Sequence, residues 1–212
     1  MIADNLERVQ SQIREAERAA GREAGSVTLL PVSKFHPVEA IREVAACGIT
    51  MVGENREQEA REKAALLDDG CGIAMIGQIQ SKKANSVARW AAEVHSLDSV
   101  KLANGLDRGM ALALERGDRT GDTLPCLIQV SADGDTSRGG VTLECLDELV
   151  AAAEEAAHLH LKGFMVVPPL DAEPRAVFEE LRSLTDEYSE RLGRNLVLSA
   201  GMSGDFETAI AC

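Results

Sequence analysis

Lys34 is the residue of this sequence best placed for covalent chemistry. It closes an apolar run, residues 27–34, and a proline suited to a helix start follows at Pro37. Runs of branched apolar residues are typical of buried strands, and α/β folds collect their active groups at the carboxyl ends of such strands. A lysine amine freed of its proton by desolvation attacks carbonyls, but most lysines are solvated. Taken alone, Lys34 therefore fits a solvated loop residue better than a nucleophile.

A second candidate site lies near the carboxyl end, in residues 198–205. There an apolar run ends, glycines such as Gly201 permit close backbone approach, and a helix is expected to begin between Ser203 and Asp205. Free amides at a helix start, with a serine hydroxyl, can hold a phosphate. An ordinary helix cap, in which Ser203 satisfies an amide and Glu207 completes the cap, explains the same spacing somewhat better.

Together, the lysine and the phosphate site would suit a ligand that carries both an aldehyde and a phosphate. Pyridoxal 5'-phosphate is one such ligand, and a sugar phosphate bound by a Schiff-base aldolase is another. The residues alone leave both open.

Composition excludes several other classes of function. The chain has 212 residues, 45% hydrophobic and 27% charged, which suits one domain. A net charge of -13 disfavours nucleic-acid partners. No apolar stretch approaches ~20 residues and the amino terminus is polar, so we expect a cytoplasmic protein without a membrane partner. The four histidines lack HExxH spacing and the five cysteines form no CxxC pair, so we expect no metal site.

The elements that must position these residues alternate regularly. After an opening helix over residues 2–20, we predict strands at residues 27–34, 49–54, 72–79, 93–97, 124–131, 160–167 and 196–202. We predict helices between them at residues 37–46, 56–67, 82–92, 99–116, 143–157 and 174–191. Such alternation forces a parallel sheet, and neither GxGxxG nor GxxxxGK is present. We therefore expect one domain, residues 1–212, folded as a (β/α)8 TIM barrel that lacks its last strand and carries an extra N-terminal helix.

Several motifs, in this order and spacing, resemble the pyridoxal-phosphate homeostasis family, whose fold resembles the N-terminal barrel of alanine racemase. The motifs are Val32-Ser33-Lys34, Gly53-Glu54-Asn55 with Gln58-Glu59, Ile76-Gly77 with Gln80 and Lys83, Gly163-Phe164-Met165, and Leu198-Ser199 with Gly201-Met202-Ser203, Asp205 and Ala209-Ile210. The resemblance implies that Lys34 forms the Schiff base and that Asn55 lines the cofactor. It places Met202 and Ser203 in the phosphate site, with Ser199 and Gly201 beside them as cofactor-binding residues.

The sequence departs from the family pattern at several places. Arg56 stands for a tyrosine, Ala74 for a histidine, Lys82 for an asparagine, Ser131 for an asparagine and Arg138 for a lysine. Family members also continue past the position of Cys212 into a last strand, whose arginine, glycine and hydroxyl residue complete the cofactor contacts. We therefore expect the natural chain to be longer, because an open barrel would leave two strand edges bare.

The sequence favours a carrier over an enzyme. Racemisation needs two acid–base groups on opposite faces of the cofactor, usually the lysine and a tyrosine. Tyr188, the one tyrosine, falls within a predicted helix and is expected to be a helix-surface or packing residue. We expect a monomeric, noncatalytic carrier of pyridoxal 5'-phosphate in vitamin B6 homeostasis, with apo-enzymes that use this cofactor as partners. The alternatives are a racemase-like enzyme and, less favoured, a Schiff-base aldolase; a second cofactor site at Lys82 and Lys83 stays open.

Overall fold

Six parallel strands form one curved sheet in the computed structural model, which describes residues 1–67 and 70–212. The strands follow one another in chain order across the sheet: β1 (Met51–Glu54), β2 (Gly72–Met75), β3 (Glu93–Leu97), β4 (Leu124–Gln129), β5 (Leu159–Met165) and β6 (Val197–Ser199). The helices are α1 (Ile2–Ala19), α2 (Val38–Ala46), α3 (Glu57–Ala64), α4 (Ala84–Trp90), α5 (Val100–Arg116), α6 (Leu143–Glu155), α7 (Pro174–Leu192) and α8 (Phe206–Ala211), with short 3-10 turns η1 (Ser81–Lys83) and η2 (Thr136–Arg138). Strand order in sequence order is that of a β/α barrel.

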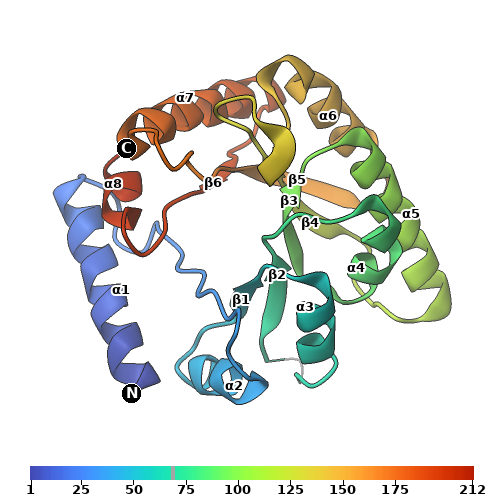
Figure 1. Ribbon diagram of the computed structural model, residues 1–212, viewed down its shortest axis with the longest axis horizontal. Helices are drawn as coiled ribbons and strands as arrows, with labels where there is room; N and C mark the ends of the chain where they lie inside the picture. The colour runs from blue at the N-terminus through green and yellow to red at the C-terminus, as the bar shows by residue number, and fades with distance from the viewer. Residues whose placement is uncertain (68–69) are drawn as a thin grey trace.

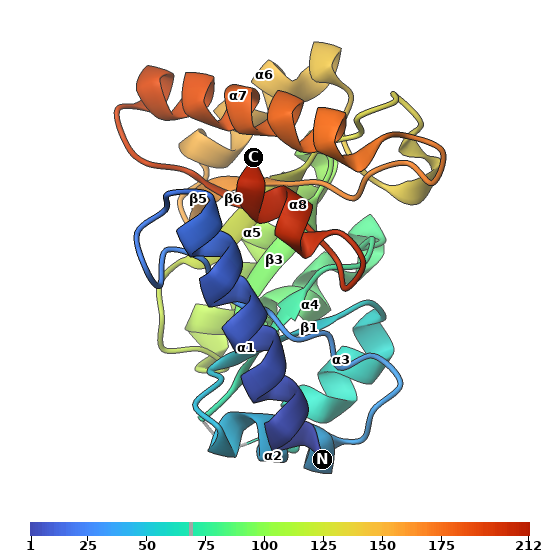
Figure 2. The same cartoon turned by 90° about the vertical axis from the view of Figure 1, so that its left-hand side faces the viewer.

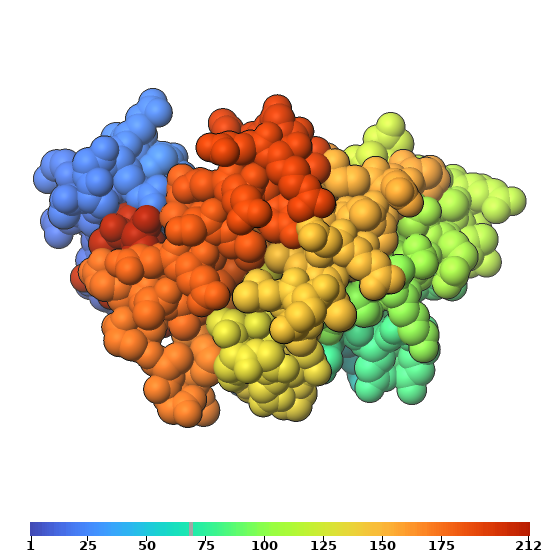
Figure 3. All heavy atoms as spheres, turned by 90° about the horizontal axis from the view of Figure 1, so that it is seen from above, coloured from blue at the N-terminus to red at the C-terminus, as the bar shows by residue number. Residues whose placement is uncertain are grey.

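The helices surround the sheet on its outer side, so the carboxyl ends of the strands meet at one mouth (Figure 1). From the side, α1 lies against α8, so the first and last helices of the chain are in contact (Figure 2). Arg22, just after α1, donates through Nε to the carbonyl oxygen of Ile210 in α8 (2.7 Å). From above, α7 and α6 form a continuous cover, with the η2 loop at its lower edge (Figure 3).

The long helices begin and end where local chemistry requires. The hydroxyl of Ser99 caps α5 by accepting from Leu102 N (3.2 Å), and Gly117 ends it with a φ of 76°. In α7, the Glu173 carboxylate accepts from Ala176 N (3.0 Å) and Pro174 occupies the first turn. Both helices pack on β5. The side chains of β3, β4 and β5 are almost all buried.

The predicted first strand does not form a regular ladder. Residues 27–34 pair with β1 only at an isolated parallel bridge between Val32 and Gly53. Gly53 N donates to Pro31 O (2.8 Å), and Ser33 N donates to Gly53 O (3.0 Å). Pro31 has no N–H to extend the pairing. The prediction of seven full strands is therefore wrong, although these two bonds still place the segment beside β1, where a first barrel strand belongs.

Some boundaries also differ from those predicted. The strand predicted over residues 196–202 ends at Ser199, because Gly201 has a φ of 88° and turns the chain. The last helix begins at Phe206 and not within residues 203–205, because Asp205 N and Phe206 N both bond to Met202 O in a preceding turn. Among the described residues, no pairing joins β6 to residues 31–33, so the barrel is not closed there.

Tyr188 is a packing residue. The sequence had left open whether it would be a packing or a helix-surface residue. Its side chain is only 5% exposed, and its ring meets the edge of Phe164 with centroids 5.2 Å apart. The hydroxyl donates to Asp147 Oδ1 (2.7 Å), which joins α7 to α6. Along the described part of the chain, no helix has the length and apolar character needed to cross a membrane.

Replacing Gly163 with alanine should break the pairing of β5 with β6. Gly163 has a φ of 153°, and a Cβ there would lie 1.9 Å from Val197 O. We expect Gly163→Ala to lower the free energy of unfolding by roughly 3 kcal/mol or more, since strain and overpacking add. Urea unfolding measures it. Gly121→Ala is the matched control, because a Cβ at Gly121 meets nothing within 4 Å. A wild-type midpoint for Gly163→Ala would contradict the pairing described.

Candidate functional site

Lys34 lies on a tight turn at the carboxyl end of the segment beside β1. His36 N donates to Ser33 O (3.0 Å) across the turn, and the Lys34 side chain is exposed. Phe35, the third residue of the turn, has a φ of 66°, a region that bulky side chains rarely adopt. Its ring is 72% exposed and lies under the Arg56 guanidinium, 5.5 Å from the ring centroid. Such strain costs about 1–3 kcal/mol and persists only where neighbouring groups hold the backbone in place.

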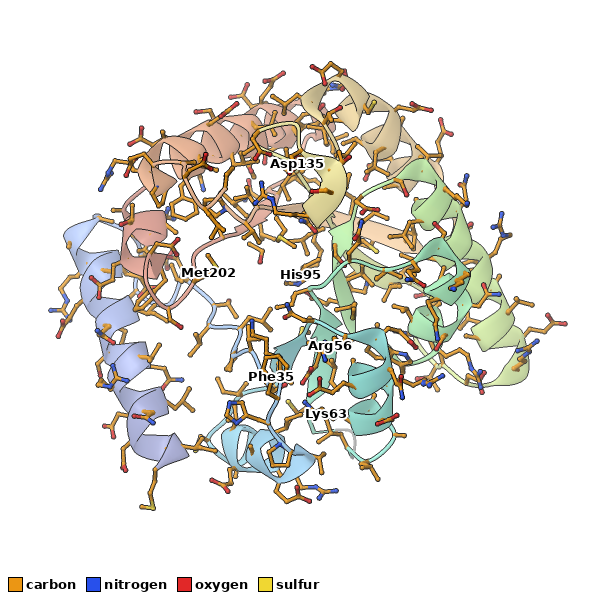
Figure 4. The ribbon with its side chains drawn as sticks, viewed as in Figure 1. Phe35, Arg56, Lys63, His95, Asp135 and Met202 are labelled. Atoms are coloured by element: carbon orange, nitrogen blue, oxygen red, sulfur yellow. The ribbon has the colours of Figure 1, made fainter. Side chains whose placement is uncertain are left out.

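A buried charged network provides that restraint. Oε1 of Glu54, the last residue of β1, accepts from Ser33 Oγ (2.6 Å) and from Lys63 Nζ (2.6 Å). Lys63 also donates to Ser33 O (2.9 Å) and Glu59 Oε1 (2.8 Å), and the same Glu59 oxygen accepts from Phe35 N (3.0 Å). Figure 4 shows Lys63 on α3, below Phe35 in that view. The turn that carries Lys34 is thus held through the backbone of Ser33 and Phe35 and through the Ser33 side chain.

The electrostatics of this network follow from burial and pairing. Burial alone would lower the pKa of Lys63, but its bonds to Glu54 and Glu59 outweigh burial and raise that pKa. The bond from Lys63 lowers the pKa of Glu59, against a smaller opposing effect of burial. Glu54 is fully buried, and its Oε2 has no hydrogen-bond partner among the described residues. The network therefore depends on Lys63 to offset a buried carboxylate.

Asn55 follows β1 directly and lies on the same edge of the sheet as Lys34. Its backbone is tightly packed, because a Cβ on Gly77 would lie 1.9 Å from Asn55 O. Asn55 and Gly77 line a cavity of about 400 Å³ over the ends of β1, β2, β4 and β5. Its other lining residues are Arg56, Ile76, Gln78, Gln129, Val130, Ser131, Ala132, Asp133, Asp135, Arg138, Gly139 and Val167. Of the residues predicted to bind a cofactor, Asn55 alone lines this cavity.

Of the other predicted residues, Gly201, Met202 and Ser203 lie together on the loop after β6, and Ser199 is the last residue of β6. Gly201 packs so closely on α8 that a Cβ would come within 2.9 Å of Phe206 Cα. The carboxylate of Asp205 accepts from Met202 N (2.5 Å), so Asp205 organises the turn instead of Ser203. Ser203 is exposed, and neither its amide nor that of Gly204 donates to any described residue. Ser203 is therefore not an ordinary helix cap. The amides of Ser203 and Gly204 and the Ser203 hydroxyl stay available as hydrogen-bond donors.

The structure links β6 to β3 through a network that the sequence did not reveal. His95 Nδ1 lies 3.2 Å from Ser199 Oγ, and His95 Nε2 lies 2.9 Å from Glu93 Oε2. Lys162 on β5 donates to Glu93 Oε1 (2.5 Å). Burial would raise the pKa of Glu93, but the bonds from His95 and Lys162 outweigh burial and lower it. Ser199 is thus fixed from the interior of the barrel.

Two pairs of residues in these networks have a spacing that the sequence shows. Glu93 and His95 are two apart on a strand and so face the same side of the sheet. Glu59 and Lys63 are four apart on a helix and so are neighbours on its surface. Neither spacing predicts the partner on another element, which is Ser199 for His95 and Glu54 for Lys63.

Comparison with known proteins places the chain in a family. The profile of the alanine racemase N-terminal domain family matches residues 5–211. The pyridoxal phosphate homeostasis protein of Corynebacterium glutamicum is 54% identical over 202 residues, which cover 95% of this chain and 91% of that protein. The chain belongs to the pyridoxal phosphate homeostasis protein family.

Other relatives agree with that assignment. The pyridoxal phosphate homeostasis protein of Escherichia coli is 34% identical and is matched over 99% of this chain and 90% of its own length. The solved structure of PipY of Synechococcus elongatus, with PLP bound, superposes with a TM-score of 0.82 at 32% identity, covering 100% of this chain and 93% of that chain. The expected α/β barrel of the alanine racemase N-terminal type is confirmed.

Removing the Lys63 amine should destabilise the protein strongly. Lys63→Met leaves the buried Glu54 carboxylate without its cation, and we expect a loss of about 3–5 kcal/mol in the free energy of unfolding. Urea unfolding measures the change. Lys101→Met, at an exposed position on α5, should change it by less than about 0.5 kcal/mol. The double variant Glu54→Gln with Lys63→Met should recover part of the loss; no recovery would mean that the single-variant loss comes from packing.

Glu93 should make stability depend on acid. Because its folded-state pKa is lowered, its contribution is fully present above the unfolded-state value of about 4.3 and is lost as pH falls through the folded-state value. We expect the difference in unfolding free energy between wild type and Glu93→Gln to shrink progressively below about pH 4. Urea unfolding between neutral and acid pH measures it. A difference that stays constant across that range would contradict the charged state assigned to Glu93.

Proposed function

We propose that this protein binds pyridoxal 5'-phosphate through a Schiff base on Lys34. The observation that supports this most directly is the state of the Lys34 amine. It is exposed at the carboxyl end of the first barrel segment and forms no ion pair or hydrogen bond with any described residue, while the turn beneath it is held by the buried Glu54 network. An amine that is free but on a fixed backbone suits condensation with an aldehyde, with loss of water.

The loop after β6 fits the phosphate of this cofactor. The unengaged amides of Ser203 and Gly204 and the Ser203 hydroxyl are hydrogen-bond donors, and Gly201 lets the backbone approach closely. Met202 lies on the same loop (Figure 4), and it is 53% exposed. We propose that Ser199, Gly201, Met202 and Ser203 hold the phosphate and that Asn55 lines the ring, as the family resemblance implies.

We further propose that the protein carries the cofactor without catalysis. The family's name for its members supports a homeostatic role. Tyr188 is unsuited to serve as a second acid–base group, because burial and its bond to Asp147 raise the pKa of Tyr188 to about 12. The proposed receivers of the cofactor are apo-enzymes that require it. One sheet and one hydrophobic cluster run through the chain, so we propose that residues 1–212 act as one binding unit, as a monomer.

Adding pyridoxal 5'-phosphate should produce the visible absorption band of a protonated Schiff base. We expect Lys34→Ala to abolish the band, because the bond-forming amine is gone. Lys101→Ala should keep it, since Lys101 is exposed on α5. Absorption spectra at saturating cofactor measure both. A band of wild-type intensity in Lys34→Ala would overturn the assignment of Lys34.

Exchange of the α-hydrogen separates a carrier from an enzyme. In heavy water with the cofactor-loaded protein, we expect L- and D-alanine to exchange no faster than with Lys34→Ala, because no second acid–base group is positioned for turnover. Proton NMR of the α-hydrogen follows the exchange. Exchange well above the Lys34→Ala rate would favour a racemase-like enzyme and contradict the carrier.

A further inference from the structure

Four polar side chains form a continuous hydrogen-bonded row through the barrel interior. From the β5 end the order is Lys162, Glu93, His95 and Ser199, with successive contacts of 2.5, 2.9 and 3.2 Å. The two middle members are buried, Glu93 at 9% and His95 at 7% exposed, and the two end members are partly exposed. His95 lies near the centre of the ring of helices in Figure 4. These contacts therefore connect Ser199, at the carboxyl end of β6, to the Lys162 cation on β5.

The carboxylate of Glu93 fixes the hydrogen on one nitrogen of His95. Glu93 is ionised, because the bonds from His95 and Lys162 outweigh the effect of burial and lower its pKa. An ionised carboxylate only accepts hydrogen bonds. His95 Nε2, 2.9 Å from Glu93 Oε2, must therefore carry a hydrogen and donate it. The protonation of His95 can then change only at Nδ1.

The state of Nδ1 decides what the Ser199 hydroxyl can do. When the imidazole is neutral, Nδ1 is an acceptor, so the Ser199 hydroxyl donates its only hydrogen to the ring. When the imidazole is protonated, Nδ1–H donates to Ser199 Oγ, and the hydroxyl hydrogen is free to turn elsewhere. An anion accepts hydrogen bonds and cannot donate to Ser199. In the neutral state it gains the hydroxyl hydrogen only if the bond to the ring is lost, whereas in the protonated state both bonds form.

We propose that His95 is a positioning residue that takes up one proton when Ser199 binds the phosphate of a ligand. The proton comes from solvent and forms the Nδ1–H bond, and the Ser199 hydroxyl rotates from the ring to a phosphate oxygen. No other covalent bond forms or breaks. This inference rests on the proposed function, because it assumes that Ser199 belongs to the phosphate site, and it makes affinity for the phosphate depend on pH.

The charges around His95 are compatible with this uptake. On its own strand, Glu93 places a carboxylate against the ring. From β5, Lys162 neutralises part of that charge from the far side of the carboxylate. Cys126, on β4, is fully buried. Burial raises the pKa of its thiol, so the thiol stays neutral, and the charge of Arg119 opposes that rise only in part. The nearest ionic neighbour of the ring is thus the Glu93 carboxylate, 2.9 Å from Nε2.

Histidine NMR on the full chain tests the proposal at constant pH. We expect pyridoxal 5'-phosphate to raise the protonated fraction of His95, and His95→Gln identifies its signal. Pyridoxal, which has the aldehyde and lacks the phosphate, should leave that fraction unchanged although it still reacts with Lys34. In Ser199→Ala the phosphate ligand should bind without the increase. His158 and His160 serve as internal references and should not respond.

The affinity should show the same coupling. Wherever His95 is neutral in the free protein and protonated in the complex, the apparent Kd of wild type should rise about tenfold more per pH unit than that of His95→Gln, which corresponds to one coupled proton. An unchanged His95 signal with bound pyridoxal 5'-phosphate, or an increase that survives in Ser199→Ala, would overturn the proposal while the Schiff base stands. Failure of both ligands to bind would overturn the proposed function and this inference together.

Discussion

The geometry of the candidate site depends on one buried carboxylate oxygen, Oε1 of Glu54. It joins three parts of the chain, because Ser33 and Lys63 both donate to it from the segment beside β1 and from α3. A buried charge is costly unless it is paired and hydrogen-bonded, so each partner must stay in place for the others to be favourable. The same lysine and Glu59 then hold the strained backbone at Phe35. The position of Lys34 therefore follows from the burial of Glu54.

Periodicity in the sequence predicted most of the fold. The order of strands and helices follows from apolar runs that alternate with helical patterns, and α5, α6 and α7 formed within about two residues of their predicted bounds. The first strand was overestimated because apolar composition does not reveal how many backbone bonds a neighbouring strand will offer. From β1, residues 31–33 receive only the two backbone bonds of Gly53. The start of α8 was misplaced because Asp205, and not Ser203, organises the preceding turn.

The candidate site was predictable only in part. Strand-end position alone selected Lys34 and Asn55, and glycine with serine selected the loop at Gly201 and Ser203, whereas their identification as cofactor residues came from the family resemblance. The contact of His95 with Ser199 joins residues 104 apart in sequence and three strands apart in the sheet. It exists only because the sheet curves, and curvature is a property of the whole sheet that no local pattern encodes. The partner of Lys63, Glu54, is only nine residues away, but a helical spacing does not show which residue of the preceding strand the helix will face.

The two sides of the mouth, the first segment with β1 and the end of β6, have different proposed roles. The first segment presents an exposed amine on a restrained turn. We propose that Ser199, at the end of β6, presents a hydroxyl whose availability depends on His95. The most direct test of the central claim is reduction of the cofactor-loaded protein with borohydride, followed by peptide mass mapping. The account predicts one modification, on the peptide that contains Lys34. Modification of Lys82 or Lys83 with Lys34 unmodified would contradict it.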